Sequence, residues 1–382
     1  MSQRTSIMAG IPASNMSLYH AIRFMVGDPC VVIDQPGTGR TLIIRDIEMD
    51  RARKHARADR VLCPADCAPA SGLSGDRETA TAQSAAEFLR REGVMSVVAD
   101  RTLPLIFADT MQRAGVTVAC DPEMGVRERR AKDEEEIASL REAQRVTEGV
   151  MRRACETIAR ATPDENGVLM HAGEWLESER LKSMIEVWLL ELGYRSPGAI
   201  VASGAHGGDC HHRGSGAIRT GELVIVDIFP QNIETRYWGD CTRTVVHGAP
   251  SPEAARMHKA VLDAKHSGER ACRAGVTGED VYRAAIAEIE RHGFQRGLPG
   301  RGFPEDATLM QHGLGHGIGL DCHEPPLADV GGPELIAGDC LTIEPGLYSI
   351  VHGGVRIEDS VVVRANGCEN LGAGLHEGLA WA

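Results

Sequence analysis

The sequence predicts two domains, an N-terminal α/β domain over residues 1–130 and a larger α+β domain over residues 131–382. The length of 382 residues exceeds what one small hydrophobic core accommodates. Short β-rich runs alternate with helical stretches in the first part, whereas long amphipathic helices separate candidate strands in the second. The second pattern favours a curved, largely antiparallel sheet that is backed by helices.

The N-terminal part contains a β-hairpin signal. β-rich runs at residues 31–34 and 42–46 flank the turn sequence QPGTGR, so the two runs are expected to pair. The further runs RVLC, SVVAD and VTVACD surround the helix-like stretch AAEFLRRE. No glycine-rich phosphate loop and no cluster of catalytic residue types occurs here, so we expect the reactive residues in the second domain.

The domain junction is expected within residues 127–132, because a strong helix signal follows it. Asp133 and Glu136 have the spacing of a capping box, and apolar residues recur at helical spacing from Ile137 to Ile158. This helix should end before Thr162 and Pro163. Three further helices are expected at residues 173–192, 252–274 and 278–292. Candidate strands lie at residues 199–203, 223–229, 240–246, 342–343 onward and 355–363.

Composition excludes several classes of protein. Hydrophobic residues make up 42% and charged residues 25%, as in soluble globular proteins, and no apolar run approaches a membrane span. The net charge of −13 argues against a general nucleic-acid binder. Scattered cysteines and the lack of a signal-peptide pattern favour a cytoplasmic location. Cys63 and Cys67 lack a second pair for a zinc site and are interpreted as ordinary thiols.

One histidine and four carboxylates stand in apolar or glycine-rich contexts, where an unpaired charge is costly. The five residues are Asp227, Asp240, His316, Glu344 and Glu358. Singly, each aspartate could be a turn or capping residue, and Glu358 could pair with Arg356. Together they favour a metal site. The mostly oxygen donor set suits Mn²⁺ and can hold Co²⁺ or Zn²⁺, and its charge favours two divalent ions.

His316 lies in the glycine-rich stretch GLGHGIG. Glycine at every second position of a strand permits close approach of backbone or ligand. A dinucleotide-binding loop is the competing interpretation. It is disfavoured because the spacing is not GxGxxG and no strand-to-helix unit surrounds the stretch.

The ordered series Asp, Asp, His, Glu, Glu, in the contexts HGLGHGIGL, TIEPGLY and GGVRIED, resembles the metallopeptidases of family M24. That family contains methionine aminopeptidase, aminopeptidase P and prolidase and has the pita-bread fold. The resemblance is strong over residues 131–382. Residues 1–130 resemble more loosely the smaller domain of the aminopeptidase P, prolidase and creatinase branch. The resemblance implies a pita-bread catalytic domain, a creatinase-like N-terminal domain and a homodimer, because dimers are common in the family.

The resemblance also implies roles for the five residues. Asp227 would bind one ion, Asp240 and Glu358 would bridge both ions, and His316 with Glu344 would complete the second site. The ions would activate a water molecule for attack on the peptide carbonyl after the first residue. Glu344 would carry a proton from that water to the leaving nitrogen.

Two further histidines match family positions. His323 would hydrogen-bond the scissile amide or its tetrahedral intermediate, and His211 would face the site from an earlier loop. His212 competes with His211, which the register favours. His312 is a candidate substrate contact or a supporting residue. Arg356 is expected to orient the metal-binding glutamate near it or to bind a substrate carboxylate.

Three features depart from the family pattern. Asp227 and Asp240 are thirteen positions apart, whereas the family usually has eleven, and two added residues keep the strand faces in phase. Prolidases carry an arginine just after the HExP segment, where this chain has HEPP followed by Leu327. Its absence favours peptides longer than a dipeptide. Residues 1–28 do not match the usual opening of the family, so the role of the N-terminal domain stays open.

We therefore expect a dinuclear metal-dependent aminopeptidase that releases the first residue from peptides with proline second. An Xaa-Pro dipeptidase, or prolidase, is the near alternative. Methionine aminopeptidases generally lack an α/β domain of this size, and the creatinase branch has lost the metal ligands present here. The alternative of another class is a non-catalytic pita-bread module that binds peptides or proteins, which the intact ligand set disfavours.

Overall fold

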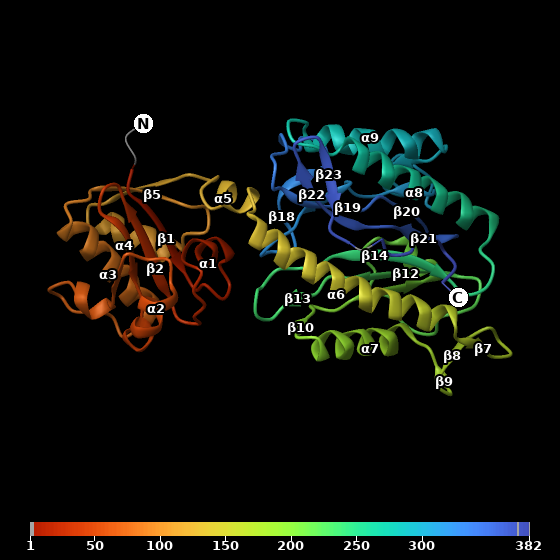
Figure 1. Ribbon diagram of the computed structural model, residues 1–382, viewed down its shortest axis with the longest axis horizontal. Coiled ribbons are helices and arrows are strands. Elements are labelled where there is room, and N and C mark those ends of the chain that lie inside the picture. The colour runs from red at the N-terminus through yellow and green to blue at the C-terminus, as the bar shows by residue number, and fades with distance from the viewer. Residues whose placement is uncertain (1–3, 373, 382) are drawn as a thin grey trace. The chain divides into compact units, whose positions relative to one another are not determined.

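The computed structural model describes residues 4–372 and 374–381 (Figure 1). The chain divides into two compact units, Met1–Arg129 and Arg130–Ala382. The boundary expected from the sequence lies after residue 130. Each unit has its own buried apolar clusters. None of the helices among the described residues has the length and apolar character that a membrane crossing requires.

The N-terminal unit contains a six-stranded sheet in the order β4-β3-β2-β1-β5-β6. Its strands are β1 (Ser6–Gly10), β2 (Cys30–Gln35), β3 (Gly39–Ile43), β4 (Arg60–Leu62), β5 (Ser96–Ala99) and β6 (Thr117–Cys120). The predicted hairpin is confirmed, because β2 and β3 pair antiparallel with Val31 opposite Ile43. β1 joins β2 antiparallel and β5 parallel, so the sheet is mixed.

Helices cover both faces of this sheet. They are α1 (Met16–Ile22), α2 (Met49–His55), α3 (Arg77–Arg91) and α4 (Leu105–Arg113). The short α5 (Val126–Arg130) buries none of its residues. Successive strand residues face opposite ways, so Val31 and Ile33 pack in the cluster of α3 and α4. Cys30 and Val32 instead pack with residues of α1 and α2. The continuous apolar run in β2 therefore reflects burial on both faces.

The C-terminal unit contains three larger sheets. The first has the order β11 (Ile200–Ser203), β12 (Leu223–Ile228) and β14 (Cys241–Val246). The second has the order β18 (Glu324–Ala328), β17 (Gly315–Gly317), β19 (Cys340–Ile343), β22 (Asp359–Arg364) and β23 (Gly367–Asn370). The third has the order β15 (Gln295–Arg296), β16 (Leu309–Met310), β20 (Gly346–Ser349) and β21 (Gly353–Arg356). Nearly all pairings are antiparallel, as expected.

Smaller ladders complete the strand set of this unit. β10 (Tyr194–Arg195) pairs with β13 (Gln231–Asn232), and β7 (Thr162–Pro163), β8 (Leu169–His171) and β9 (Glu174–Trp175) form a three-stranded ladder. β13 lies in the loop between Asp227 and Asp240. Part of that loop therefore pairs with β10.

Four helices pack against the three larger sheets (Figure 1). They are α6 (Glu134–Ala159), α7 (Ser178–Glu191), α8 (Pro252–Ala271) and α9 (Gly278–Arg291). Buried residues of α6 and α7 share a cluster with β11, β12 and β14. Buried residues of α8 and α9 share another with β19, β21 and β22. The predicted capping box is confirmed, because the Asp133 side chain accepts from the Glu136 amide and the Glu136 carboxylate accepts from the Asp133 amide.

Two helix predictions were too long. α7 begins at Ser178 and not at residue 173, because residues 169–175 form the β8–β9 hairpin. α8 ends at Ala271 and not at residue 274, because Cys272 adopts an extended backbone conformation. Apolar residues recur at helical spacing before the start of α7 and after the end of α8. The backbone conformation there is set instead by contacts with neighbouring segments.

The strand predicted at residues 355–363 is wrong in one respect. The structure has two strands, β21 ending at Arg356 and β22 beginning at Asp359, and they belong to different sheets. Ile357 and Glu358 form the break between them. Glu358 is thus presented from a point where the chain crosses from one sheet to the next.

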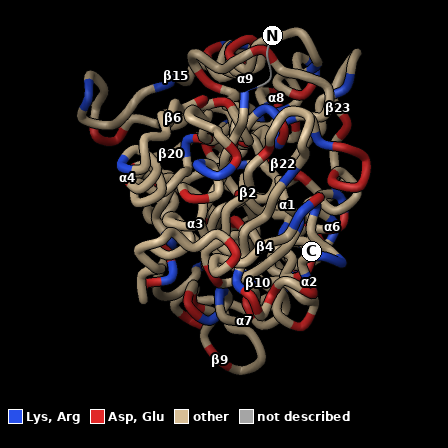
Figure 2. Tube along the Cα trace, turned by 90° about the vertical axis from the view of Figure 1, so that its left-hand side faces the viewer, with Lys and Arg blue, Asp and Glu red and all other residues tan. Residues whose placement is uncertain are grey.

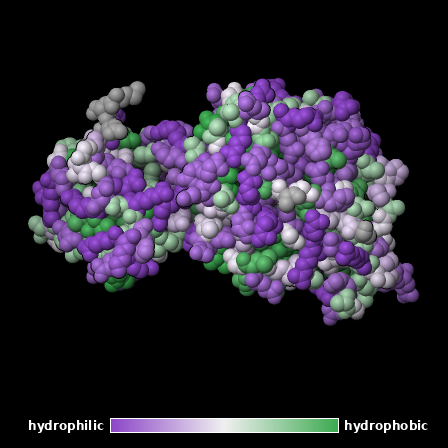
Figure 3. All heavy atoms as spheres, in the orientation of Figure 1, coloured by the Kyte–Doolittle hydropathy of each residue, from purple (hydrophilic) through white to green (hydrophobic). Residues whose placement is uncertain are grey.

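Charges of both signs are interspersed along the chain (Figure 2), and most of the face in Figure 3 is hydrophilic. Many charged side chains form ion pairs with residues three or four positions away in the same helix, as Arg145 does with Glu142 in α6 and Arg283 with Glu279 in α9. Such exposed pairs contribute little to stability. Carboxylates that are buried together are therefore the feature that needs an explanation.

Candidate metal centre

A cavity of about 640 Å³ opens in the C-terminal unit and is lined by all five predicted metal ligands. Asp227 lies on β12, Asp240 directly precedes β14 and His316 lies on β17. Glu344 directly follows β19, and Glu358 lies between β21 and β22. The structure therefore brings together residues that are up to 131 positions apart in the sequence.

Strand pairing places the two aspartates on one side of the sheet. Asp227 stands opposite Thr242 in the β12–β14 ladder. Asp240 lies two positions before Thr242, and side chains two positions apart face the same way on a strand. The carboxylates of Asp227 and Asp240 are thus diagonal neighbours across adjacent strands.

Three of the ligands form a group of the size that a metal ion occupies. One side-chain donor atom each from Asp240, His316 and Glu358 lies within 4.8 Å of the others. His316 Nε2 is also 3.5 Å from Glu344 Oε1 and 3.8 Å from Asp240 Oδ2. His316 Nδ1 donates to the Gly317 carbonyl at 3.1 Å, which leaves Nε2 as the acceptor nitrogen that faces the carboxylates.

Nearby protein groups hold the acidic ligands in place. The Thr242 hydroxyl donates to Glu358 Oε2 at 2.7 Å and accepts from Arg356 Nε at 3.2 Å. Arg356 Nη2 donates to Asp227 Oδ2 at 2.6 Å. Asp227 Oδ1 is buried and has no hydrogen-bond partner in the structure. A buried carboxylate oxygen without a partner is costly, and a cation in the cavity would remove that cost.

The shifted pKa values of the acidic residues also indicate a cation site. Burial, followed by the charges of Asp227 and Glu344, raises the pKa of Asp240. Burial and the Asp240 charge raise the pKa of Glu358, and burial raises the pKa of Glu344 to about 7. Carboxylates that repel one another in a buried site fit divalent cations, which compensate the charge. The residues present therefore suit a divalent metal site.

Two histidines share the cavity with the acids. The His323 ring lies edge-on to the His316 ring, with the centroids 4.0 Å apart. His211 lines the cavity as well. The neighbouring His212 instead stacks on His206 at 4.2 Å between centroids, and its Nδ1 accepts from the Gly214 amide. The geometry thus favours His211 over His212 as the residue that meets a substrate.

His312 and Arg356 are more enclosed than the sequence suggested. His312 Nδ1 is 2.8 Å from the Gly313 carbonyl and Nε2 is 2.5 Å from the Tyr348 hydroxyl. Burial lowers the pKa of His312 to about 3, so the ring is neutral. Arg356 Nη1 donates to the same Tyr348 hydroxyl at 2.9 Å. Arg356 pairs with Asp227 and is linked to Glu358 through the Thr242 hydroxyl.

Sequence reasoning missed several residues that line the cavity or bond to its lining, among them Arg213, Trp238, Thr242 and Tyr348. Trp238 and Arg213 line the cavity directly. Thr242 occupies the position opposite Asp227, and a register prediction for the two strands would have identified it. Tyr348 lies on β20 and connects His312 with Arg356. No local sequence signal indicates that connection.

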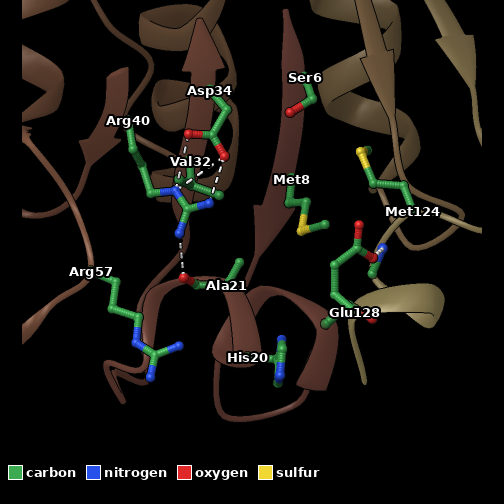
Figure 4. A pocket seen from close by; sticks show the side chains of 12 residues that line it. Ser6, Met8, His20, Ala21, Val32, Asp34, Arg40, Arg57, Met124 and Glu128 are labelled. Carbon is green, nitrogen blue, oxygen red and sulfur yellow. Dashed lines mark hydrogen bonds and ion pairs between the residues drawn. The ribbon is translucent and has the colours of Figure 1, made fainter. Parts of the chain in front are cut away.

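A second cavity, of about 250 Å³, lies within the N-terminal unit (Figure 4). Asp34 accepts from Arg40 at 2.7 to 3.1 Å, and Arg40 Nη1 also donates to the Ala21 carbonyl at 2.6 Å. These polar groups satisfy one another. The cavity thus lacks the concentration of buried like charges that marks the first one.

Comparison with known proteins places the chain in a family. The family model described as "Metallopeptidase family M24" matches residues 138–365, more than half of the chain. The Xaa-Pro dipeptidase of Pyrococcus horikoshii is 27% identical, over 73% of this chain and 74% of that protein. Crystal structures of an Xaa-Pro dipeptidase from Bacillus anthracis and an X-Pro aminopeptidase from Thermotoga maritima have TM-scores of 0.78 and 0.76. Each is 22% identical to this chain. The dipeptidase match covers 98% of this chain and 94% of that protein, and the aminopeptidase match covers 96% of this chain and 95% of that protein. These likenesses confirm the predicted pita-bread architecture. The chain belongs to metallopeptidase family M24.

Proposed function

We propose that this protein is a dinuclear metal-dependent peptidase that releases the N-terminal residue from peptides with proline in second position. The observation that carries the proposal is the convergence of Asp227, Asp240, His316, Glu344 and Glu358 on one cavity. Family membership and relatives that are named for Xaa-Pro dipeptidase and X-Pro aminopeptidase activity support the reaction class.

The donor set supports two divalent ions, with Mn²⁺ preferred and Co²⁺ or Zn²⁺ as alternatives. Asp240 and Glu358 would be shared between the ions, Asp227 would complete one site, and His316 with Glu344 would complete the other. Divalent ions in these sites lower the pKa of a coordinated water and polarise a carbonyl group. The hydrogen bond from Arg356 to Asp227 fixes the carboxylate that would bind the first ion.

The chain itself supplies the proton transfers and the substrate contacts. Glu344, whose pKa is raised to about 7 in the protein alone, would accept the proton of the attacking water and deliver it to the leaving nitrogen. Burial lowers the pKa of His323, so its ring is neutral and can donate a hydrogen bond to the developing oxyanion. His211 would contact the substrate from the opposite loop. His312 would hold Tyr348, and through it Arg356, in position.

Peptide length is the point on which two candidate functions differ. Leu327 faces His316 across the β17–β18 pair and is 55% exposed, so no cation stands at that position to bind a dipeptide carboxylate. This observation favours an aminopeptidase that acts on longer peptides. The relative named Xaa-Pro dipeptidase favours the second candidate, a prolidase. Comparison of Ala-Pro with Ala-Pro-Ala as substrates separates the two.

We also propose a cytoplasmic homodimer. The eleven cysteines, all in the described part of the chain, form no disulfide, which agrees with a reducing compartment. Light scattering of the purified protein tests the oligomeric state.

The decisive experiment combines metal analysis with an assay of Xaa-Pro cleavage. Bound transition metal and release of the first residue after Mn²⁺ addition are expected. Protein that binds no transition metal and releases nothing from Xaa-Pro peptides with Mn²⁺ or Co²⁺ would instead be a non-catalytic peptide-binding module. Competitive binding of an uncleaved Xaa-Pro peptide would then identify that module.

A further inference from the structure

Two arginines line the catalytic cavity, Arg213 and Arg356. Arg356 is buried, with 3% of its surface exposed, and it donates to Asp227, Thr242, Tyr348 and the Cys210 carbonyl. Its guanidinium group is therefore occupied within the protein. A substrate anion would have to replace several charge-assisted hydrogen bonds to reach it.

Arg213 differs because it is exposed and its guanidinium has few contacts. Its Nη1 donates to the Pro197 carbonyl at 3.1 Å. No carboxylate of the described residues lies within ion-pair distance of it, whereas Asp329, which also lines the cavity, pairs with Arg296 at 3.2 Å. Arg213 thus brings an uncompensated positive charge to the wall of the cavity, where it can bind an anion.

The backbone around Arg213 is held in a defined position. The Arg213 carbonyl accepts from the Val201 amide and from Lys182 Nζ, each at 3.2 Å. Gly198, with φ of +107°, makes room for the guanidinium, because a Cβ at that position would lie 2.6 Å from Arg213 Nη1. These contacts set where the side chain leaves the loop and reduce the freedom that it must lose on binding.

We propose that Arg213 binds the free carboxylate of an Xaa-Pro dipeptide, and this inference rests on the second candidate of the proposed function, the prolidase. His211, which would contact the substrate, lies two positions before Arg213 in the same loop. The carboxylate of a dipeptide lies one residue beyond its scissile bond, and Arg213 lines the same cavity as the predicted metal ligands. A planar guanidinium matches a carboxylate with two parallel hydrogen bonds. Arg213 therefore supplies, from another loop, the cation that is missing at Leu327.

The test is a comparison of Arg213→Gln with Arg219→Gln, both loaded with Mn²⁺. Arg219 is exposed in the same segment and likewise donates one Nη1 hydrogen bond to a backbone carbonyl, at 3.0 Å, but it does not line the cavity. The substrates are Ala-Pro, which has a free carboxylate, and Ala-Pro amide, which has none. Thermal unfolding of both variants checks that the fold is intact.

Arg213→Gln should lower kcat/KM for Ala-Pro by about 10- to 100-fold, mainly through KM, because a charged hydrogen-bond partner is lost. It should change kcat/KM for Ala-Pro amide by less than about threefold. Arg213→Lys should retain part of the preference for the dipeptide, and Arg219→Gln should match the unmodified protein. Equal losses on both substrates, or no loss on Ala-Pro, would overturn the proposal.

A binding measurement separates this inference from the proposed function. Proline, the product with a free carboxylate, and prolinamide are titrated calorimetrically into the metal-free protein. Tighter binding of proline that is lost in Arg213→Gln supports the role of Arg213 even if no peptide is cleaved. Equal binding of proline and prolinamide removes Arg213 as the carboxylate contact, whatever the peptidase assay gives.

Discussion

Thr242 offers a sharp test of how the protein prepares its metal ligands. This residue is completely buried on β14 opposite Asp227. Its hydroxyl donates to Glu358 Oε2 at 2.7 Å and accepts from Arg356 Nε at 3.2 Å. Thr242→Val keeps the shape and the β-branching but removes both hydrogen bonds. Glu358 would then lose the contact that orients its carboxylate toward Asp240 and His316.

The expected loss follows from the kind of hydrogen bond that is removed. A hydrogen bond to a charged group contributes about 1.5–3 kcal/mol. At about 1.4 kcal/mol for each factor of ten, the corresponding loss of affinity is about 10- to 100-fold. The same range is typical when a residue that supports a metal ligand is removed.

The assay is calorimetric titration of the metal-free variants with Mn²⁺. Thr244→Val is the matched control, because Thr244 is also buried on β14 but its hydroxyl bonds only to the backbone of Arg356. It should lose stability and keep its metal affinity. If both variants bind Mn²⁺ as the unmodified protein does, Thr242 has no part in orienting Glu358 and the reasoning is wrong.

Three further predictions concern other parts of the structure. Gly214→Ala places a Cβ 1.6 Å from a backbone oxygen and should lower the free energy of unfolding in denaturant by about 3 kcal/mol or more. Gly216→Ala, at a left-handed position without such an obstruction, should lower it by about 1 kcal/mol. Similar losses in the two variants would contradict the steric explanation. Asp240→Ala should abolish activity without unfolding the chain, and near-normal turnover would remove Asp240 from the site. Burial alone would raise the pKa of Glu377, but Lys265 holds it below its usual value. The ionised Glu377 carboxylate should stabilise the folded state fully above its pKa in the unfolded chain, about 4.3. This stabilisation should be lost as the pH falls through the lower pKa of Glu377 in the folded protein. The acid limb of stability should therefore be flatter in Glu377→Gln, and an unchanged limb would contradict the assignment.

Elements of the fold were predictable where neighbouring residues alone determine the structure. The capping box at Asp133 and the turn sequence between β2 and β3 each fix an element from a few neighbouring residues. The start of α7 was not predictable in this way, because the β8–β9 hairpin competes with helix formation there. Helical periodicity cannot show that competition, since it depends on pairing with other segments.

The site was predictable as a set of residue types, and its contacts were not. Arg356 is close to Glu358 in sequence, which suggested a direct pair, but the structure joins Arg356 to Asp227, 129 positions away. Arg356 is linked to Glu358 through the Thr242 hydroxyl instead of by a direct ion pair. Arg213 carried no sequence signal, because only the folded loop brings it to the cavity. Specificity residues of this kind depend on tertiary structure.

Elemental analysis of the purified protein, together with its cleavage of Ala-Pro and Ala-Pro-Ala, decides whether this chain is a metallopeptidase. We expect up to two divalent ions for each chain after Mn²⁺ addition and release of free alanine. We also expect that Asp240→Ala loses both metal and activity while its thermal unfolding remains cooperative. Alanine release that persists without any bound transition metal, or full metal loading with no cleavage of either peptide, would contradict the proposed function.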